Sequence, residues 1–217
     1  AVEETGRGVY EDKVIKNMFA TEYIWHDIKK EKTVGVLDEN EMEGYVEVAE
    51  PVGVIAGVTP TTNPTETIIC NSIGMLAAGN AVVFSPHPRA KKVSLHLIQL
   101  INKALCKAGA PANLVVTVSA PSIENTNAMM SHPKIRMLVA TGGPAIVKTV
   151  LSSGKKAIGA GAGNPPVVVD ETADIEKAAK DIVDGCSFDN NLPCIAEKEA
   201  IAVDSVADYL IFNMKKN

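Results

Sequence analysis

The sequence predicts an α/β protein built on a Rossmann-like parallel sheet with helices on both faces. Short Val-rich segments alternate with longer helical segments at least four times along the chain. Turn-forming residues, mainly glycine, proline and asparagine, bound these segments. Strands that alternate with helices in this way lie parallel, because each helix carries the chain back across the sheet.

The first fifty residues are expected to form a helix and an edge strand. Residues 10–32 have an amphipathic pattern, and their apolar residues recur at helical spacing: Val14, Ile15, Met18, Phe19 and Ile28. Residues 35–44 are polar and acidic, which is typical of a turn region. Residues 45–49 alternate apolar and polar side chains, which indicates a half-buried or edge strand. These elements define an N-terminal region over residues 1–50.

The main α/β pattern begins after Pro51. Residues 52–58 form a continuous apolar run, as expected of a strand buried on both faces. A helix over residues 64–78 follows, with Asn63 at its N-cap and Glu66 three residues after the cap. Further strands are predicted at 81–84, 114–118, 137–140 and 166–169, and further helices at 88–108, 122–131, 143–152 and 174–184.

Composition excludes several classes of function. The 217 residues are 46% hydrophobic, so the chain can bury a sizeable core. The net charge of −5 comes without a basic stripe, so we expect no nucleic-acid partner. No apolar run is long enough for a membrane span, and the four cysteines form no C-x-x-C pair, so we expect no membrane insertion, no metal site and a cytoplasmic location. Because the chain opens at Ala1 and not at a Met, we expect it to be part of a longer protein.

Candidate binding residues lie in the loops after the predicted strands, because ligands of parallel sheets bind at the carboxyl ends of the strands. These loops are Thr59–Asn63, Ser85–Pro88, Thr141–Pro144 and the Gly-rich stretch from Gly159. Taken singly, each signal is weak: Asn63 is more often a simple cap, and Thr141–Pro144 lacks the G-x-G-x-x-G pattern and is more often an ordinary tight turn. His87 is better explained as a surface residue or a cofactor contact than as a catalyst.

The Gly-rich stretch 159–166 and Cys194 are the remaining candidates. The glycines favour close approach of the backbone to a ligand, or a crowded packing point, and they supply no acid or base. Cys194 follows Asn-Asn-Leu-Pro in a predicted loop, which makes it a candidate nucleophile, although no histidine lies near it in the sequence to activate it. The other three cysteines lie in or near apolar helical patterns and are expected to be small core residues: Cys70, Cys106 and Cys186.

Five segments in the same order resemble the CoA-acylating aldehyde dehydrogenases. They are Thr59–Asn80, Phe84–Ala90, Ala140–Pro144, Gly159–Pro166 and Phe188–Cys194. This group includes the propionaldehyde and ethanolamine-utilisation enzymes and the aldehyde half of bifunctional aldehyde–alcohol dehydrogenases. The resemblance covers essentially the whole chain, and the five motifs in register are far more specific than any one of them.

The resemblance implies a role for each candidate. Cys194 matches the nucleophile, and Asn63 matches the asparagine whose amide, with the backbone N–H of the cysteine, forms the oxyanion hole. Relatives of this kind bind NAD or NADP, and CoA reaches an overlapping site. The implied cofactor-binding residues are Thr59, Pro60, Thr61, Ser85, Pro86, His87, Pro88, Thr141, Gly142, Gly143 and Gly161.

Two departures from the hydrolytic aldehyde dehydrogenases bear on the reaction. Ser85 stands where those enzymes carry a lysine that contacts the adenosine ribose, so the choice between NAD and NADP as cofactor stays open. Ala160 stands where they carry the glutamate that activates water, give or take one position. Without that base a thioester on Cys194 is expected to persist until a CoA thiol attacks it, so the predicted product of a short-chain aldehyde is acyl-CoA.

The resemblance also divides the chain. Residues 51–190 match the NAD(P)-binding domain, and residues 191–217 match the start of a catalytic domain, so the isolated chain is expected to turn over poorly or not at all. Relatives are commonly homo-oligomers, and some enter bacterial microcompartments. Two alternatives stay open: an enzyme like the γ-glutamyl-phosphate reductases, which use a cysteine without CoA, and a cofactor-binding or assembly module without turnover.

Overall fold

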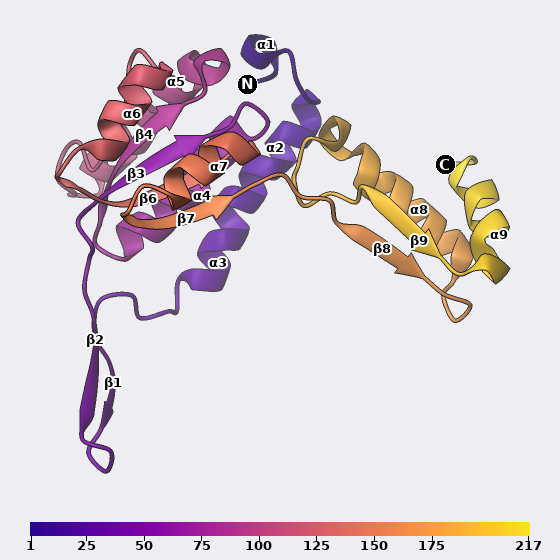
Figure 1. The fold of residues 1–217 in the computed structure, drawn as a ribbon, viewed down its shortest axis with the longest axis horizontal. Helices are drawn as coiled ribbons and strands as arrows, with labels where there is room; N and C mark the ends of the chain where they lie inside the picture. The colour runs from indigo at the N-terminus through magenta and orange to yellow at the C-terminus, as the bar shows by residue number, and fades with distance from the viewer.

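A five-stranded parallel sheet forms the centre of the protein, as a computed structural model covering residues 1–217 shows (Figure 1). Its strand order is β5-β4-β3-β6-β7. The strands are β3 (Val54–Thr59), β4 (Ala81–Pro86), β5 (Val115–Thr117), β6 (Ile135–Thr141) and β7 (Lys156–Ala160). The predicted Rossmann-like parallel sheet is therefore confirmed.

The strand order contains a switch point between β3 and β6. The chain builds β3, β4 and β5 outward in one direction, then crosses to β6 on the other side of β3 and continues to β7. The connections that leave β3 and β6 therefore diverge, and a crevice opens between the carboxyl ends of these two strands.

Helices cover both faces of this sheet, as predicted. Helices α4 (Pro64–Ala77) and α5 (Lys91–Lys107) pack on one face, where Ile68 and Phe84 are fully buried. Helices α6 (Ile123–Ser131) and α7 (Pro144–Leu151) pack on the other face around Leu138 and Val150. A single 3-10 turn, η2 (Pro88–Ala90), precedes α5.

One strand of the sheet escapes prediction from the sequence. Gly159 and Ala160, expected to lie in a Gly-rich loop, are the last two residues of β7 and pair with Ala140 and Thr141. Glycine and alanine are depleted in strands, so the local pattern gives no strand signal. The pairing comes instead from the neighbouring strand β6, which supplies the hydrogen-bonding edge.

The N-terminal helix buries its charged side instead of its apolar side. After the short α1 (Val2–Thr5), the predicted helix 10–32 is present as α2 (Tyr10–Met18), a π-helical turn (Phe19–Tyr23) and α3 (Ile24–Ile28). The apolar residues of the amphipathic pattern are largely exposed: Val14, Ile15, Met18 and Phe19. Lys13 and Lys16 are buried instead, so the amphipathic pattern does not mark the buried side of this helix. Buried ammonium groups need carboxylate partners, and the main body supplies them.

A two-stranded hairpin projects from the body of the molecule (Figure 1). It joins β1 (Gly35–Asn40) to the predicted edge strand β2 (Tyr45–Ala49). The expectation of a turn over residues 35–44 is therefore wrong for its first six residues, which are the strand β1. Most residues of β1 are exposed, so no buried face imposes on this strand the alternation by which strands are detected.

A second, smaller layer lies toward the C-terminus (Figure 1). Strand β8 (Pro166–Val169) pairs in parallel with β9 (Glu199–Ala202), and helices α8 (Ile175–Ser187) and α9 (Asp204–Met214) pack against them. Strand β8 and helix α8 were expected to belong to the 51–190 domain, but they pack with residues 199–214 and not with the five-stranded sheet. The packing changes between β7 and β8, ahead of the expected division at residue 190. No helix in the structure combines the length and the apolar character that crossing a bilayer requires.

Candidate active site at the switch point of the sheet

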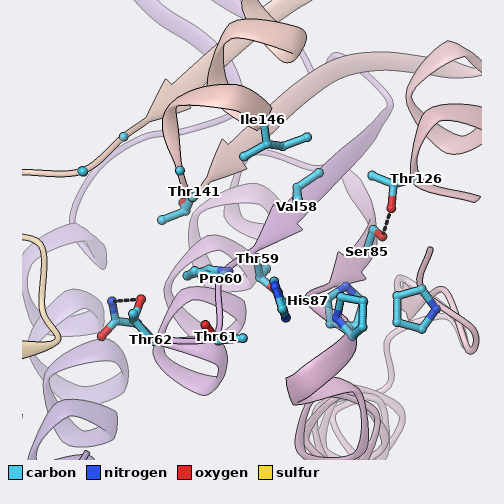
Figure 2. Close-up of a pocket in the computed structure, with 18 of the residues that line it drawn as sticks. Val58, Thr59, Pro60, Thr61, Thr62, Ser85, His87, Thr126, Thr141 and Ile146 are labelled. Atoms are coloured by element: carbon cyan, nitrogen blue, oxygen red, sulfur yellow. Dashed lines mark hydrogen bonds between the residues drawn. The ribbon is translucent and has the colours of Figure 1, made fainter. Parts of the chain in front are cut away.

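A cavity of about 740 Å³ opens at the carboxyl ends of the strands (Figure 2). It lies at the switch point, where an open α/β sheet is expected to bind its ligand. The structure brings every site residue expected from the sequence to the wall of this one cavity. These residues are Thr59, Pro60, Thr61, Asn63, Ser85, Pro86, His87, Pro88, Thr141, Gly142, Gly143, Gly161 and Cys194.

The loop after β3 places Asn63 at the wall without using its side chain as a helix cap. Asn63 is the N-cap residue of α4, as predicted, but no side-chain cap bond forms there, so the expected capping box is absent. The Asn63 Oδ1 accepts a hydrogen bond of 2.5 Å from Lys16 Nζ, and its Nδ2 donates to Thr62 Oγ1 at 3.1 Å. Glu66 turns toward the same lysine, with its Oε1 3.6 Å from Lys16 Nζ.

Ser85 lies near the carboxyl end of β4, within the strand and not in the loop expected from the sequence, and His87 follows directly after the strand. Ser85 is buried, and its hydroxyl shares a hydrogen bond of 2.7 Å with Thr126 (Figure 2). The His87 Nδ1 accepts a hydrogen bond from the backbone N–H of Arg89. Burial lowers the pKa of His87, and the charges of Arg89 and Arg7 lower it further. His87 is therefore a neutral imidazole near pH 7.

The glycines at the cavity do two different jobs. A Cβ at Gly143 or Gly161 would meet no atom within 4 Å, so both leave the backbone open toward the cavity. A Cβ at Gly142 would lie 2.9 Å from Ile146, and one at Gly163 would lie 2.1 Å from the carbonyl oxygen of Cys194. Within the Gly-rich stretch, Gly163 is therefore a crowded packing point, whereas Gly161 leaves the backbone open toward the cavity, where close approach of a ligand stays a prediction.

Cys194 lies between two cavities. It is partly exposed and lines the cavity described above together with a second one of about 930 Å³. Asn63 and Thr141 line both cavities as well. Apolar walls of the second cavity come from the N-terminal helices and the Cys194 loop: Phe19, Ala20, Tyr23, Ile24, Phe188 and Ile195.

Four carboxylates also line the second cavity: Asp27, Glu66, Asp184 and Glu197. Asp184 is paired with Lys180, and no hydrogen bond joins any of the four carboxylates to the Cys194 thiol. Glu66 is engaged with the ammonium group of Lys16. The Gly-rich stretch itself contributes no carboxylate, as its sequence requires.

The other three cysteines are not core residues, contrary to expectation. Cys106 is exposed, while Cys70 and Cys186 are half-buried. Burial raises the pKa of the Cys70 thiol. Each lies on a helix but is not among the buried residues of that helix, so helical periodicity alone misplaces them.

Two groups of cavity residues escaped prediction. The first follows β5: Pro121, Ser122, Ile123, Thr126 and Asn127. The carboxyl-end rule applies equally to the predicted strand 114–118, so the sequence held the signal for this group. The second group is Lys16 and Lys198, and it had no local signal, because lysines on a helix or in a loop normally point to water.

A comparison with known protein families matches residues 11–217 to the aldehyde dehydrogenase family. The chain belongs to the aldehyde dehydrogenase family. A family relative, the CoA-propanoylating propanal dehydrogenase of Salmonella typhimurium, is 54% identical over 218 residues, which cover 98% of this chain and 45% of the relative. The bifunctional aldehyde-alcohol dehydrogenase AdhE of Escherichia coli is 50% identical over 96% of this chain and 23% of its own length.

Solved structures of family members superpose over the whole chain. The Rhodopseudomonas palustris propionaldehyde dehydrogenase with bound propionyl-CoA is 67% identical, with a TM-score of 0.87, and the match covers 100% of this chain and 47% of that one. An engineered glycolyl-CoA reductase with bound NADP+ is 64% identical over 100% of this chain and 48% of that one, with a TM-score of 0.85. A propionaldehyde dehydrogenase from a Clostridium phytofermentans microcompartment is 50% identical over 100% and 49% of the two chains, with a TM-score of 0.83. The chain thus spans about half the length of these enzymes, or less.

Proposed function

We propose that the protein to which this chain belongs oxidises a short-chain aldehyde with NAD(P)+ and transfers the acyl group to CoA. The observation that carries the proposal is the position of Cys194 and Asn63 on the wall shared by two cavities. One cavity is formed by the loops of the parallel sheet, and the other has apolar walls. A nucleophile at such a junction can meet a cofactor from one side and an aldehyde from the other.

The first cavity fits a dinucleotide. The buried hydroxyl of Thr59 has no hydrogen-bond partner within the chain, so it is available to a ligand. Gly143 and Gly161 leave room for close approach to the backbone, and Gly143 immediately precedes α7, whose amino end favours negative charge. When bound there, NAD(P)+ supplies the hydride acceptor of the reaction.

The residues of this chain then account for the rest of the reaction. The Cys194 thiolate attacks the aldehyde carbon, and the carbonyl oxygen becomes an oxyanion. The Asn63 amide and the backbone N–H of Cys194 stabilise that oxyanion as hydrogen-bond donors. Departure of hydride leaves a thioester on Cys194, and the thiolate of CoA attacks its carbonyl carbon, forms acyl-CoA and releases Cys194 as a thiolate.

The absence of a positioned base directs the thioester to CoA and not to water. Water is a weak nucleophile and needs general-base help, typically worth about 10²–10⁴-fold. The position expected for the water-activating glutamate is Ala160, the last residue of β7. Of the carboxylates near the thiol, Glu66 is neutralised by Lys16 and Lys13. Relatives support this outcome, because one is named for CoA-propanoylation and a solved neighbour holds propionyl-CoA.

The test measures the products of the full-length enzyme. We expect acyl-CoA to form faster than free acid whenever CoA is present, and C194S to abolish both products. Glu197 is a carboxylate to exclude, because it lines the same cavity as Cys194, follows it by three residues in the chain and has no lysine partner, unlike Glu66 and Asp184. E197Q is expected to leave the ratio of acyl-CoA to free acid unchanged; faster release of free acid than of acyl-CoA by the wild type would refute the proposal.

One observation favours the open alternative of a module without turnover, but only for the isolated 217 residues. They span about half the length of the relatives, so the remaining walls of the aldehyde cavity are expected from the rest of the protein. The γ-glutamyl-phosphate-reductase alternative receives no support from the relatives, which are named for aldehydes and CoA. The two chemistries are separated by supplying either acyl-CoA or acyl-phosphate to the full-length enzyme and measuring which of them oxidises NADH.

The assembly state is part of the same proposal. We expect a homo-oligomer in which the projecting hairpin pairs with a second copy. Both strands of the hairpin present exposed apolar side chains, among them Val36, Leu37, Val46 and Val48. Deletion of residues 36–48 should reduce the assembly state in analytical ultracentrifugation. A neighbour from a microcompartment makes that compartment, or the cytoplasm around it, the expected location.

A further inference from the structure

A buried group of four charges joins the N-terminal helix to the Cys194 loop. Lys13 and Lys16 point from α2 toward Asp189 and Glu66. Lys16 Nζ is hydrogen-bonded to Asp189 Oδ2, and Lys13 Nζ lies 2.9 Å from the same oxygen. Lys16 is 8% exposed and Asp189 0%, so water does not screen these pairs. Two ammonium groups balance two carboxylates, which makes the group neutral as a whole.

Lys16 also contacts the proposed oxyanion donor. Its Nζ donates a hydrogen bond of 2.5 Å to Asn63 Oδ1. A lysine ammonium has only donors, so the atom of the Asn63 amide that faces it has to be the oxygen. The NH₂ group of Asn63 is thereby turned away from Lys16. One of its two N–H bonds goes to Thr62 Oγ1, and the second has no partner within the chain.

The same lysine holds the loop that carries the nucleophile. Asp189, Asn190 and Asn191 have left-handed φ angles of 49°, 53° and 56°, which non-glycine residues adopt at a cost. Asp189 is anchored by Lys13, by Lys16 and by the backbone N–H of Val9, which donates to its Oδ1 at 2.9 Å. Lys16 is therefore bonded at once to the oxyanion donor and to the start of the strained segment that leads to Cys194.

We propose that Lys16 is a positioning residue for the reaction: it sets the orientation of the Asn63 amide and ties that amide to the Cys194 loop through Asp189. The proposal rests on the proposed function, in which Asn63 stabilises the oxyanion that forms on attack by Cys194. Without the ammonium group, the amide of Asn63 is free to rotate by half a turn and present its oxygen to the developing negative charge. An oxygen at that place repels the oxyanion instead of stabilising it.

The main test compares K16M with N63A in the full-length enzyme. Loss of one oxyanion donor typically slows the chemical step by about 10²–10³-fold, so N63A should fall in that range. K16M is expected to slow the pre-steady-state formation of NAD(P)H by about tenfold or more. The aldehyde-independent alkylation of Cys194 by iodoacetamide should stay within about twofold of wild type in both variants, because alkylation forms no oxyanion. In the double variant, K16M should add less than about twofold to N63A, since the lysine acts through the amide.

Matched variants separate positioning from folding. K13M removes a buried lysine that contacts Asp189 but not Asn63, so it should destabilise the protein while slowing the chemical step less than K16M. K29M, at an exposed position after α3, should match wild type in every measurement. K16R keeps the charge and the donors and should restore most of the rate, whereas K16Q can face the amide with either a donor or an acceptor and should not.

The possible results distinguish the two proposals. If N63A forms NAD(P)H slowly but K16M forms it at the wild-type rate, the role of Lys16 is overturned and the proposed function stays intact. A wild-type rate in N63A overturns the oxyanion role of Asn63, and the role of Lys16 with it. Independent, multiplicative effects of the two changes also overturn the inference. If K16M does not fold, the comparison of K16R with K16Q decides: equal rates in these two variants contradict it.

Discussion

Gly163 determines how closely the Gly-rich segment approaches Cys194, the proposed nucleophile. Its Cα faces the backbone of Cys194, and a Cβ there would lie 2.1 Å from the Cys194 carbonyl oxygen. A methyl group at this position has to push the Cys194 carbonyl away, and with it Cys194 itself, whose backbone N–H is a proposed oxyanion donor. The glycine is thus required by a close approach and not by an unusual φ angle.

We therefore expect G163A to lower kcat of the full-length enzyme by about 10²-fold, the effect typical of a misplacement near 1 Å. G74A is the matched control, because a Cβ at Gly74 meets nothing within 4 Å and alanine favours the helix by about 1 kcal/mol. Steady-state rates of both variants check the prediction. A G163A enzyme as active as G74A would show that the Cys194 peptide has room to move without consequence.

Asp189 makes the stability of the protein depend on acid. Burial acts to raise the pKa of Asp189, but hydrogen bonds from Lys16, Lys13 and the Val9 N–H outweigh it, so the pKa lies below its ordinary value. A carboxyl whose pKa falls on folding contributes stability above its unfolded pKa of about 3.9, and that contribution is lost as pH falls through the folded pKa.

We expect D189N to cost about 3–5 kcal/mol of unfolding free energy near pH 7, because two buried ammonium groups lose their anion. Below pH 4 the wild type should lose stability more steeply than D189N. Urea unfolding at pH 7, 5 and 3 measures both effects. Parallel pH dependences of the two proteins would mean that Asp189 keeps an ordinary pKa.

Among the elements, helix α5 depends on an N-terminal cap that comes from α1, at the start of the chain. Its own N-cap residue, Ala90, has no side chain to bond the first N–H groups of the helix. Glu4 of the short α1 supplies that cap, since its Oε1 accepts from the Lys92 N–H at 2.8 Å and its Oε2 from the Val93 N–H at 2.7 Å. A carboxylate there satisfies two free donors and interacts favourably with the helix dipole.

E4A is accordingly expected to destabilise the protein by about 1 kcal/mol, the usual value of an N-cap. E3A, on the same turn but exposed and without such contacts, should change stability by less than about 0.5 kcal/mol. Thermal unfolding of both variants checks this. Equal midpoints for E3A and E4A would show that α1 does not stay on α5 in solution.

At the scale of the whole molecule, two packed units meet at the site, and the smaller one has an open face. The side chains of Val168 on β8 and Ile201 on β9 are 73% and 50% exposed. The relatives are about twice as long as this chain or longer, and in them the resemblance places most of the catalytic domain beyond the matched residues. We expect that part to cover this face and to complete the second cavity.

The isolated 217-residue chain is therefore expected to form no acyl-CoA at steady state, while its Cys194 still reacts with iodoacetamide. Mass spectrometry of the labelled peptides distinguishes Cys194 from the exposed Cys106, which also reacts. The full-length enzyme assayed in parallel is the control for activity. Sustained acyl-CoA formation by the short chain would mean that its own walls already complete the aldehyde site.

The sequence alone determined the parallel sheet, most of its helices and the loops that bear the site. Those features follow from local periodicity, from turn residues and from the rule that parallel strands present their carboxyl ends at one edge, so Thr59, His87 and Gly143 were placed correctly in one cavity. The five sequence motifs in register also predicted the aldehyde dehydrogenase family correctly.

Only the tertiary structure decided which side of α2 is buried, that Gly163 and not Gly161 is crowded, and that the Asn63 side chain bonds Lys16 instead of the first N–H groups of α4. Each of these depends on a partner far away in the chain: Gly163 and Cys194 lie 31 positions apart, and Lys16 and Asn63 lie 47 positions apart. Local propensity ranks what a segment prefers by itself. A charged side chain can be buried only where folding brings an opposite charge to it, and the local sequence does not show which distant residue that partner is.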